Sequence, residues 1–525
     1  MNATGAAVAL PAALLDPATY PHPVDAPVRL VETHVSWVAL TGPCAYKVKK
    51  PLRLSFLDYS TAERRAHCCA EELRLNRRFA PDLYLDVVTI TRDGNRLRIG
   101  SNRGEVVDHA VRMVQFDPRE ELDALVERGE VRCEELDALG TQIAAVHSHA
   151  ARSDSGSGFG SPARVRQVLL DNFAELSALA LHEPVPRLMR ILRDWADATA
   201  PRLQLRWQQR LEAGWIRECH GDLHCANAVR WRDRLTAFDG IEFDPALRHI
   251  DVAADIAFLT MDLAARGRRD LRHAALDAWA NALGDFDALP LLPWYETYRA
   301  LVRAKVAALR ARQRGERPET DPSLLRYLTW AERRTQPTTP RLVLCCGLSG
   351  SGKTWLARRV APTLEALHLR SDVERKRLAG LDALADSRSP PDGGLYTREF
   401  NARTYARLVE CAARCLDGGE NVIVDAAHLR RNERAELLAV AQQRGCPAHI
   451  LHSIAPLETR RGRVAARRHE GRDASEADVA LLDRQAGYWE PFEGDERDVV
   501  IEIDTTQANA DAEAIERLRA TAPRT

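Results

Sequence analysis

Residues 347–354 read Gly-Leu-Ser-Gly-Ser-Gly-Lys-Thr, a glycine-rich loop that ends in a lysine and a hydroxyl side chain. An apolar run, residues 342–346, precedes the loop and a helical pattern follows it, so backbone N–H groups at a helix N-terminus would face bound phosphates. Lys353 would contact the β- and γ-phosphates of ATP, and the hydroxyl of Thr354 would bind Mg²⁺. The loop residues expected to contact the nucleotide are Gly347, Ser349, Gly350, Ser351, Gly352, Lys353 and Thr354.

Two carboxylates further along the chain are placed for the same chemistry. Asp425 follows the apolar run 422–424 and suits a Mg²⁺-binding carboxylate at the end of a buried strand, with a strand-end cap as the alternative. Asp372 follows another short strand and can take the proton of a substrate hydroxyl, while Arg375 can hold a substrate anion. The alternative for this pair is a helix N-cap beside a surface arginine.

Arginines recur on one predicted helix face after these carboxylates. Arg460, Arg463 and Arg467 are spaced i, i+3 and i+7, so their guanidinium groups would lie on the same side of a helix. Such a helix can close over a transferring phosphate, and we expect Arg463 and Arg467 to take part in catalysis. An arginine-rich, solvated helix is the alternative interpretation.

A second, unrelated pattern lies in residues 220–227, His-Gly-Asp-Leu-His-Cys-Ala-Asn. Asp222 can orient a hydroxyl and take its proton, and Asn227 can bind Mg²⁺ through its amide oxygen. The strand-like run 235–238 leads into Asp239, a carboxylate expected on Mg²⁺, and His220 is expected to brace the loop. The chain therefore holds two sets of residues suited to ATP-dependent phosphoryl transfer.

The segment from His220 to His224, with Phe238-Asp239 and Asp251, resembles the aminoglycoside phosphotransferase family, a branch of the protein-kinase-like fold. The resemblance covers most of residues 25–330 and implies an α+β domain of that fold. It does not establish an aminoglycoside substrate, because one fold hosts many reactions.

The same resemblance implies the nucleotide contacts further upstream. Lys47 and Lys49 match the phosphate-contacting basic position of that family; they share one strand face, and we favour Lys49. Lysine is rare here, with six among 74 basic residues, and it is not interchangeable with arginine. The carboxylate partner of the lysine is expected at Glu72 or Glu71, with a surface pair as the alternative.

Met113 lies where the adenine-binding hinge of that family is expected, although a buried strand residue explains it equally well. The sequence also departs from the family pattern. The glycine-rich cover over the phosphates is reduced to residues 41–43, Thr-Gly-Pro. Two extra carboxylates, Glu242 and Asp244, follow Asp239 and are either second-metal ligands or solvated loop residues.

The second half of the chain resembles the small P-loop kinases, a group that includes gluconate kinase, polynucleotide 5′-kinases and zeta-toxin-like kinases. The likeness rests on residues 347–354, Arg370-Ser-Asp372, Asp425 and the arginine helix, and it covers most of residues 341–500. These families phosphorylate hydroxyl groups of sugars, nucleotides or polynucleotides. Nearly the whole chain resembles bacterial fusions of an aminoglycoside-phosphotransferase-like domain to an ATP-binding P-loop domain.

The polar, proline-containing segment 334–340 marks the expected domain boundary. We predict a protein-kinase-like α+β domain over residues 1–335 and an α/β P-loop domain over residues 341–525. In the second domain, strand-like runs at 342–346, 366–369, 422–424, 449–454 and 499–503 alternate with helical stretches. This alternation predicts a parallel sheet covered by helices.

The composition narrows the class of protein further. The chain has 525 residues, is 45% hydrophobic, and has a formal net charge of −1, so no general basic field favours nucleic acid. Its N-terminal residues carry no basic region before an apolar stretch, and no apolar run is long enough to span a bilayer. We expect a cytoplasmic protein whose eleven cysteines are reduced and which has no membrane partner.

Three functional hypotheses follow from the sequence. The leading one is an enzyme with two ATP- and Mg²⁺-dependent kinase sites that act on hydroxyl groups of small polar metabolites, such as sugars, nucleosides or aminoglycoside-like compounds. The second makes the P-loop domain a regulatory ATPase. The third makes that domain a polynucleotide 5′-hydroxyl kinase, which the neutral charge and the lack of interleaved aromatic residues disfavour. Neither the substrates nor the oligomeric state is predicted.

Overall fold

A computed structural model describes most of the chain. The described residues are 10–24, 27–54, 57–94, 96–389, 393–470, 473–476 and 479–521. Backbone contacts divide them into two compact units, one of residues up to 266 with 298–326, and one of residues 267–297 with 327 onward. Residues 267–297 therefore belong with the P-loop half of the chain, although they precede the expected boundary, which itself stays a prediction.

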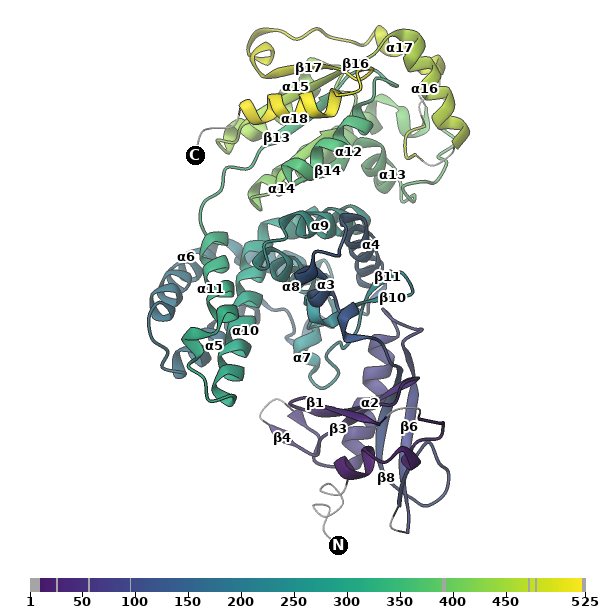
Figure 1. The fold of residues 1–525 in the computed structure, drawn as a ribbon. Coiled ribbons are helices and arrows are strands. Elements are labelled where there is room, and N and C mark those ends of the chain that lie inside the picture. The colour runs from purple at the N-terminus through teal and green to yellow at the C-terminus, as the bar shows by residue number, and fades with distance from the viewer. Residues whose placement is uncertain are drawn as a thin grey trace. The chain divides into compact units, whose positions relative to one another are not determined.

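The first unit contains a six-stranded antiparallel sheet in the order β1-β2-β3-β8-β6-β7 (Figure 1). Its strands are β1 (Arg29–Glu32), β2 (Ser36–Leu40), β3 (Cys44–Lys49), β6 (Tyr84–Asp93), β7 (Arg96–Ile99) and β8 (Glu105–Val114). Because side chains alternate along a strand, Lys47 and Lys49 of β3 lie on one face of the sheet. The sheet thus presents both lysines to whatever packs on that face.

Helix α2 (Ala62–Asn76) packs on this sheet, and its contacts with β8 are extensive. The helix begins where the Thr61 hydroxyl accepts the backbone N–H of Arg64, a typical N-cap. Leu73 and Cys69 of α2 join a core cluster with Val111 and Met113 of β8. This packing places Glu72, which is fully buried, toward the lysines of β3.

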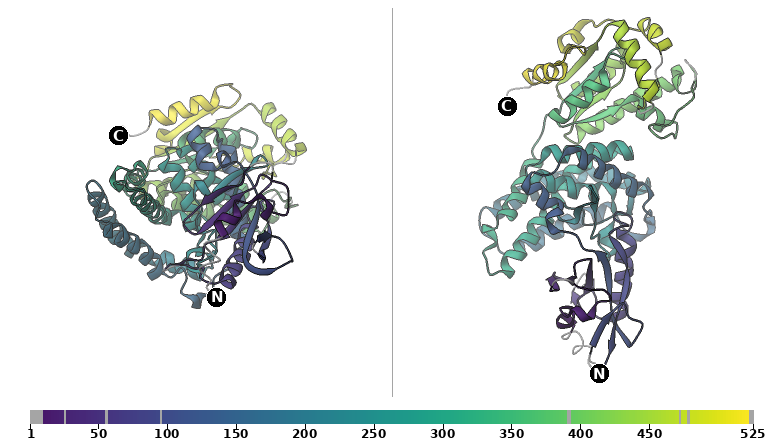
Figure 2. Two further views of the ribbon diagram at one scale, coloured as in Figure 1. Left: turned by 60° about the horizontal axis from the view of Figure 1, so that its bottom comes forward. Right: turned by 45° about the vertical axis from the view of Figure 1, so that its right-hand side comes forward.

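The rest of the first unit is mainly helical, with short strand pairs that frame its loops. Its helices are α3 (Leu122–Arg128), α4 (Cys133–His149), α5 (Pro162–Ala178), α6 (Val185–Glu212), α7 (Pro245–Arg248) and α8 (Val252–Ala265). Helices α5 and α6 lie side by side (Figure 2). The pairs are β4 (Arg53–Leu54) with β5 (Leu57–Asp58), β9 (Ile216–Glu218) with β12 (His249–Asp251), and β10 (Ala228–Trp231) with β11 (Arg234–Ala237).

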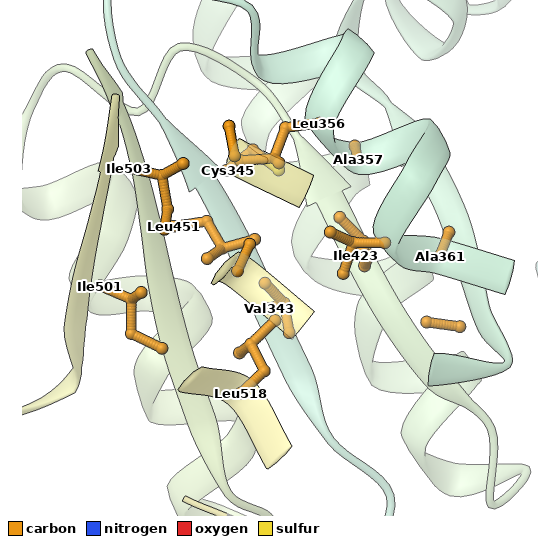
Figure 3. Close-up of a cluster of buried hydrophobic side chains, with 14 residues drawn as sticks. Val343, Cys345, Leu356, Ala357, Ala361, Ile423, Leu451, Ile501, Ile503 and Leu518 are labelled. Carbon is orange, nitrogen blue, oxygen red and sulfur yellow. The ribbon is translucent and has the colours of Figure 1, made fainter. Parts of the chain in front are cut away.

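The second unit is built on a five-stranded parallel sheet, as the alternating runs predict, in the order β14-β15-β13-β16-β17. Its strands are β13 (Leu342–Cys346), β14 (Ala366–Arg370), β15 (Asn421–Asp425), β16 (Ala448–Ile454) and β17 (Val500–Asp504). Figure 3 shows Val343 and Ile423 of the sheet in one apolar cluster with Leu356 of α12 and Leu518 of α18. Burial of this cluster holds α12 and α18 on the sheet.

Helices surround this sheet on several sides. They are α9 (Arg269–Leu283), α12 (Lys353–Leu364), α13 (Ser371–Leu378), α14 (Arg398–Asp417), α15 (Arg431–Gln443), α16 (Leu457–Glu470), α17 (Val479–Ala486) and α18 (Ala510–Ala520). Two further helices, α10 (Leu292–Gln313) and α11 (Pro322–Arg334), contribute residues to both units. Among the residues that the structure describes, no helix has the length and apolar character needed to cross a membrane.

Candidate active sites

The loop that carries Asp222 runs between β9 and β10, and hydrogen bonds to a side chain of α8 hold it in place. The backbone N–H groups of His220 and Gly221 donate to the two carboxylate oxygens of Asp255, at 3.0 and 2.8 Å. The ring Nε2 of His220 donates to the carbonyl of Phe238 at 2.8 Å, which ties the loop to the end of β11. His220 therefore has the bracing position expected for it, and Asp255 is a support that the motif does not reveal.

Asp222 is held beside Asn227 within this loop. The amide nitrogen of Asn227 donates to the backbone carbonyl of Asp222 at 2.9 Å and to its Oδ2 at 3.0 Å. The ring Nε2 of His224 lies 3.5 Å from the same Oδ2. Burial opposes ionisation, but the charge and hydrogen bond of His224 hold the pKa of Asp222 well below its usual range. The carboxylate is therefore ionised and able to accept a proton.

Asp239 follows β11 in a left-handed backbone conformation, with φ of 60°. Its N–H donates to the hydroxyl of Tyr84 at 3.0 Å, and the next N–H, of Gly240, donates to Asn76 Oδ1 at 2.8 Å. These bonds fix the backbone while the carboxylate of Asp239 stays 42% exposed. A non-glycine residue held in this conformation next to a loop of candidate catalytic residues is typical of a functional site.

Lys47 and Lys49 both contact Glu72, but they differ in their exposure and in their second partner. Lys47, 12% exposed, lies 2.8 Å from Glu72 Oε1 and also contacts Asp239. Lys49 is completely buried and contacts Glu72 and Glu242. Of the two glutamates considered for this pairing, Glu72 is therefore the one beside the lysines.

The remaining carboxylates of this region have partners of their own. Glu71 pairs with Arg74 at 2.8 Å. Glu242 is buried and accepts a hydrogen bond from the Tyr59 hydroxyl in addition to its contact with Lys49, so it is not a solvated loop residue. Asp244 caps α7 by accepting the N–H of Ala246 at 2.8 Å.

Met113 lies near the end of β8, buried in the cluster that also holds Phe238. The adjoining Phe116 ring meets Phe238 edge-to-face, with centroids 5.2 Å apart. Gln115 Oε1 accepts the N–H of Gly42 at 2.9 Å, which joins this segment to the short Thr-Gly-Pro turn. Apolar rings beside the Asp239 loop are the surroundings that an adenine ring requires.

The donor set of the first site suits Mg²⁺. The amide nitrogen of Asn227 is engaged by Asp222, so the amide oxygen is the atom that can bind a cation. Asp239 adds an exposed carboxylate. Oxygen donors of this kind, few in number and open to a phosphate ligand, are what Mg²⁺ prefers.

The glycine-rich loop of the second unit runs from the end of β13 to the start of α12. A Cβ atom on Gly350 would lie 2.5 Å from the carbonyl oxygen of Arg460, so only glycine fits the loop at that point. The N–H of Ser349 donates to Gln485 Oε1 at 2.8 Å, and Lys353 Nζ donates to the Leu348 carbonyl at 3.0 Å. The loop has the close-packed shape that phosphate binding requires.

Asp425 lies at the carboxyl end of β15 and is buried there. Burial opposes its ionisation, but hydrogen bonds with His368 and Thr354 and the charge of Arg370 hold the pKa of Asp425 well below its usual range. Thr354 and Asp425, both expected to bind Mg²⁺, thus lie close together in the wall of one cavity. A hydroxyl and an ionised carboxylate beside a phosphate-binding loop fit that ion.

One cavity of about 1890 Å³ joins the loop to the other predicted residues of this unit. The predicted residues that line it are Ser349, Gly350, Gly352, Lys353, Thr354, Asp372, Asp425, Arg463 and Arg467. The guanidinium of Arg463 donates to the Thr505 hydroxyl at 2.8 Å and to its carbonyl at 2.9 Å. Arg460, on the same helix, donates to the Ala455 carbonyl at 3.2 Å.

The side of the cavity next to Asp372 is polar and aromatic. Arg375 donates to the Leu395 carbonyl at 2.8 Å and to Asn401 Oδ1 at 2.6 Å. Its guanidinium lies 5.0 Å from the centre of the Tyr396 ring. Arg375 is therefore a fixed cation in the cavity wall rather than a mobile surface arginine.

Comparison with known proteins places the chain. It is 30% identical to the uncharacterized protein Rv2004c of Mycobacterium tuberculosis over an alignment of 470 residues. The alignment covers 89% of this chain and 92% of the relative. The uncharacterized protein Mb2027c of Mycobacterium bovis matches equally well. The chain belongs to the family of these mycobacterial proteins. Residues 342–492 also match the family model of an AAA domain, which contains the glycine-rich loop and Asp425.

Two solved structures are similar to parts of the chain. A gluconokinase from Sinorhizobium meliloti matches 35% of this chain and 95% of its own, with 20% identity and a TM-score of 0.27. A choline/ethanolamine kinase family protein from Mesorhizobium loti matches 62% of this chain and 99% of its own, with 12% identity and a TM-score of 0.34.

The positions of several residues around the two sites could not be predicted from the sequence. His224 is part of the first motif, but only its distance from Asp222 shows that it supports the carboxylate. Tyr84 and Asn76 lie far from Asp239 in the chain, and a strand histidine such as His368 is usually a core residue. Their contributions depend on tertiary contacts.

Proposed function

We propose that this protein is an ATP-dependent phosphotransferase with two kinase sites, one in each unit. The observation that carries the proposal for the second unit is the meeting of Thr354, Asp425 and Asp372 in one cavity with the glycine-rich loop. The loop and Lys353 bind the phosphates of ATP there. Asp372 takes the proton of the acceptor hydroxyl as its oxygen attacks the γ-phosphorus, and ADP leaves.

In the first unit, Asp222 is the proton acceptor and Lys47 the phosphate contact. Lys47 is chosen over Lys49 because it contacts Asp239 and remains partly exposed, whereas Lys49 is enclosed by Glu72 and Glu242. Asn227 and Asp239 hold Mg²⁺, which neutralises phosphate charge when bound. Asp222, ionised beside His224, orients the acceptor hydroxyl and receives its proton as the γ-phosphoryl group moves from ATP to the acceptor oxygen and ADP leaves.

The acceptor is proposed to be a small polar molecule with a hydroxyl group, of the sugar, nucleoside or aminoglycoside-like class. The cavity of the second unit, about 1890 Å³, exceeds the roughly 300–1,000 Å³ typical of a site for one small ligand. It therefore has room for a nucleotide and an acceptor together. Arg375, fixed beside Asp372, favours an acceptor that carries an anionic group at this site.

The test is ATP consumption by the full-length protein against a panel of sugars, sugar acids, nucleosides, aminoglycosides and 5′-hydroxyl oligonucleotides. Asp222→Asn and Lys353→Ala are measured beside the wild type. A compound whose phosphorylation is abolished by one variant and retained by the other assigns that reaction to one unit. If nothing in the panel stimulates turnover while both variants still bind nucleotide, a regulatory ATPase replaces the proposal.

A further inference from the structure

Helix α9 lies before the P-loop domain in the chain, yet it is a fixed part of the second unit. Arg272 of α9 forms two hydrogen bonds with Glu420, at 2.7 and 3.0 Å, and lies 3.1 Å from Glu296. Arg334 contacts the same two glutamates, at 2.6 and 3.1 Å. Because Glu296 and Glu420 are buried, this network of two arginines and two glutamates fixes the helix firmly.

The helix lies along β14, which is the edge strand of the parallel sheet. Asp277 of α9 accepts the backbone N–H of His368 at 2.8 Å and the side-chain amide of Asn281 at the same distance. An edge strand presents backbone groups without a partner strand, and a side chain from a covering helix can satisfy them. Asp277 therefore sets the position of β14 at the level of His368.

His368 connects this edge to the proposed metal-binding carboxylate. It is 9% exposed, and its ring Nε2 lies 3.2 Å from Asp425 Oδ2, a distance at which the ring N–H donates to the carboxylate. The register pairs His368 with Ile423 and Arg370 with Asp425, so both side chains of β14 lie on the same sheet face as Asp425. Arg370 approaches the same oxygen only to 3.8 Å, and it is committed to Asp473 at 2.8 Å.

We propose that His368 is a positioning residue for Asp425 and that α9 fixes it through Asp277. The inference rests on the proposed function of the P-loop site. By holding Oδ2, His368 would fix the carboxylate and leave its other oxygen available to a metal ion, as a hydrogen-bonding partner behind a metal ligand does. Part of the P-loop site is thereby supplied by a helix that precedes the P-loop domain in sequence.

The test measures, by calorimetry of the full-length protein in Mg²⁺ and in EDTA, how strongly Mg²⁺ tightens binding of the ADP equivalent that Lys353→Ala weakens. The variants are His368→Leu, which removes the donor, His368→Gln, which keeps an N–H donor, and Asp277→Ala. We expect His368→Leu to reduce the tightening by about tenfold or more, and Asp277→Ala to reduce it by a smaller factor. ADP affinity in EDTA should stay within about twofold, and His368→Gln should recover most of the effect.

Arg269→Ala is the matched control, because Arg269 lies on the same helix but pairs with Glu365 at the surface. Unchanged Mg²⁺ dependence in both His368→Leu and Asp277→Ala would overturn the inference and leave the proposed function intact. Equal losses in all four variants would also overturn it, since they would show a general loss of structure. If His368→Leu does not fold, Asp277→Ala decides. Failure of the wild type to bind ADP would overturn the proposed function of this site as well.

Discussion

Lys47 and Lys49 share one carboxylate partner, and each has a second partner that the other lacks. Lys47 joins Glu72 to Asp239, the residue expected on the metal ion, while Lys49 joins Glu72 to Glu242 beneath the surface. Phosphate can approach Lys47, whereas Lys49 has no exposed surface. We therefore expect the two lysines to have different tasks, Lys47 in nucleotide binding and Lys49 in holding the loop that carries Asp239.

This difference predicts that replacing either lysine with methionine affects a different property, turnover at Lys47 and stability at Lys49. Lys47→Met should lower turnover at the first site by about 10²-fold or more, with a small change in stability. Lys49→Met should cost about 3–5 kcal/mol of unfolding free energy, because Glu72 and Glu242 would remain buried without their cation. Urea unfolding and ATP consumption measure the two effects. Lys50→Met, which removes a surface pair with Glu32, is the control. A Lys49→Met protein of normal stability would contradict this view.

Glu121 gives a prediction that depends on pH. Burial and the nearby charges of Asp123 and Asp239 raise the pKa of Glu121 from 4.5 to about 7. Below pH 4.5 the carboxyl is neutral in both folded and unfolded states, so Glu121→Gln should change stability little. Between about pH 4.5 and 7 the unfolded state ionises first, and the wild type loses stability relative to the variant. The difference should level off above pH 7.

Unfolding of the two proteins in urea at several pH values measures this difference. Glu120→Gln removes a neighbouring carboxylate and serves as the control. A stability gain for Glu121→Gln that is the same at pH 5 and pH 8 would show that the group titrates normally.

At the scale of elements, the strands of the second unit could be predicted because each is a short apolar run between helical stretches. All five runs form strands, and the sheet is parallel. The membership of α9 in this unit could not be predicted. It depends on Arg272, Glu296, Arg334 and Glu420 meeting in space, and nothing in their sequence spacing indicates that they form one network. The choice between Lys47 and Lys49 could not be made from the sequence either, because both share one strand face.

This arrangement predicts how a fragment cut at the expected boundary will behave. A protein of residues 341–525 lacks Arg272 and Arg334, so Glu420 would lose both cations, and the edge of β14 would lose its cover. Such a fragment should unfold at a lower temperature than the same unit in the full chain and should self-associate through the uncovered edge. Sedimentation and thermal unfolding measure both properties. A monomeric fragment of undiminished stability would show that α9 is dispensable for folding.

At the scale of the whole molecule, the proposed function gives the chain two nucleotide sites that share no residue. Lys47, Asp222 and Asp239 belong to one compact unit, and Lys353 and Asp425 belong to the other. Full-length protein should therefore bind two equivalents of ADP in the presence of Mg²⁺. Lys353→Ala should weaken one of these equivalents by at least about tenfold, because a charged hydrogen bond to phosphate contributes about 1.5–3 kcal/mol. Lys47→Met should weaken the other equivalent.

Calorimetry resolves the two equivalents, and the pair of variants shows whether the sites communicate. Independent sites require that each variant leave the remaining equivalent at its wild-type affinity, and that the double variant lose both. If either single variant changes the affinity of both equivalents, binding in one unit is coupled to binding in the other, and by linkage the coupling must have the same size in both directions. Coupling of equal size in both directions would therefore identify a regulatory P-loop unit. Two kinases that are only joined by the chain would show no coupling, because a tether between uncoupled sites raises only the local concentration of a shared intermediate.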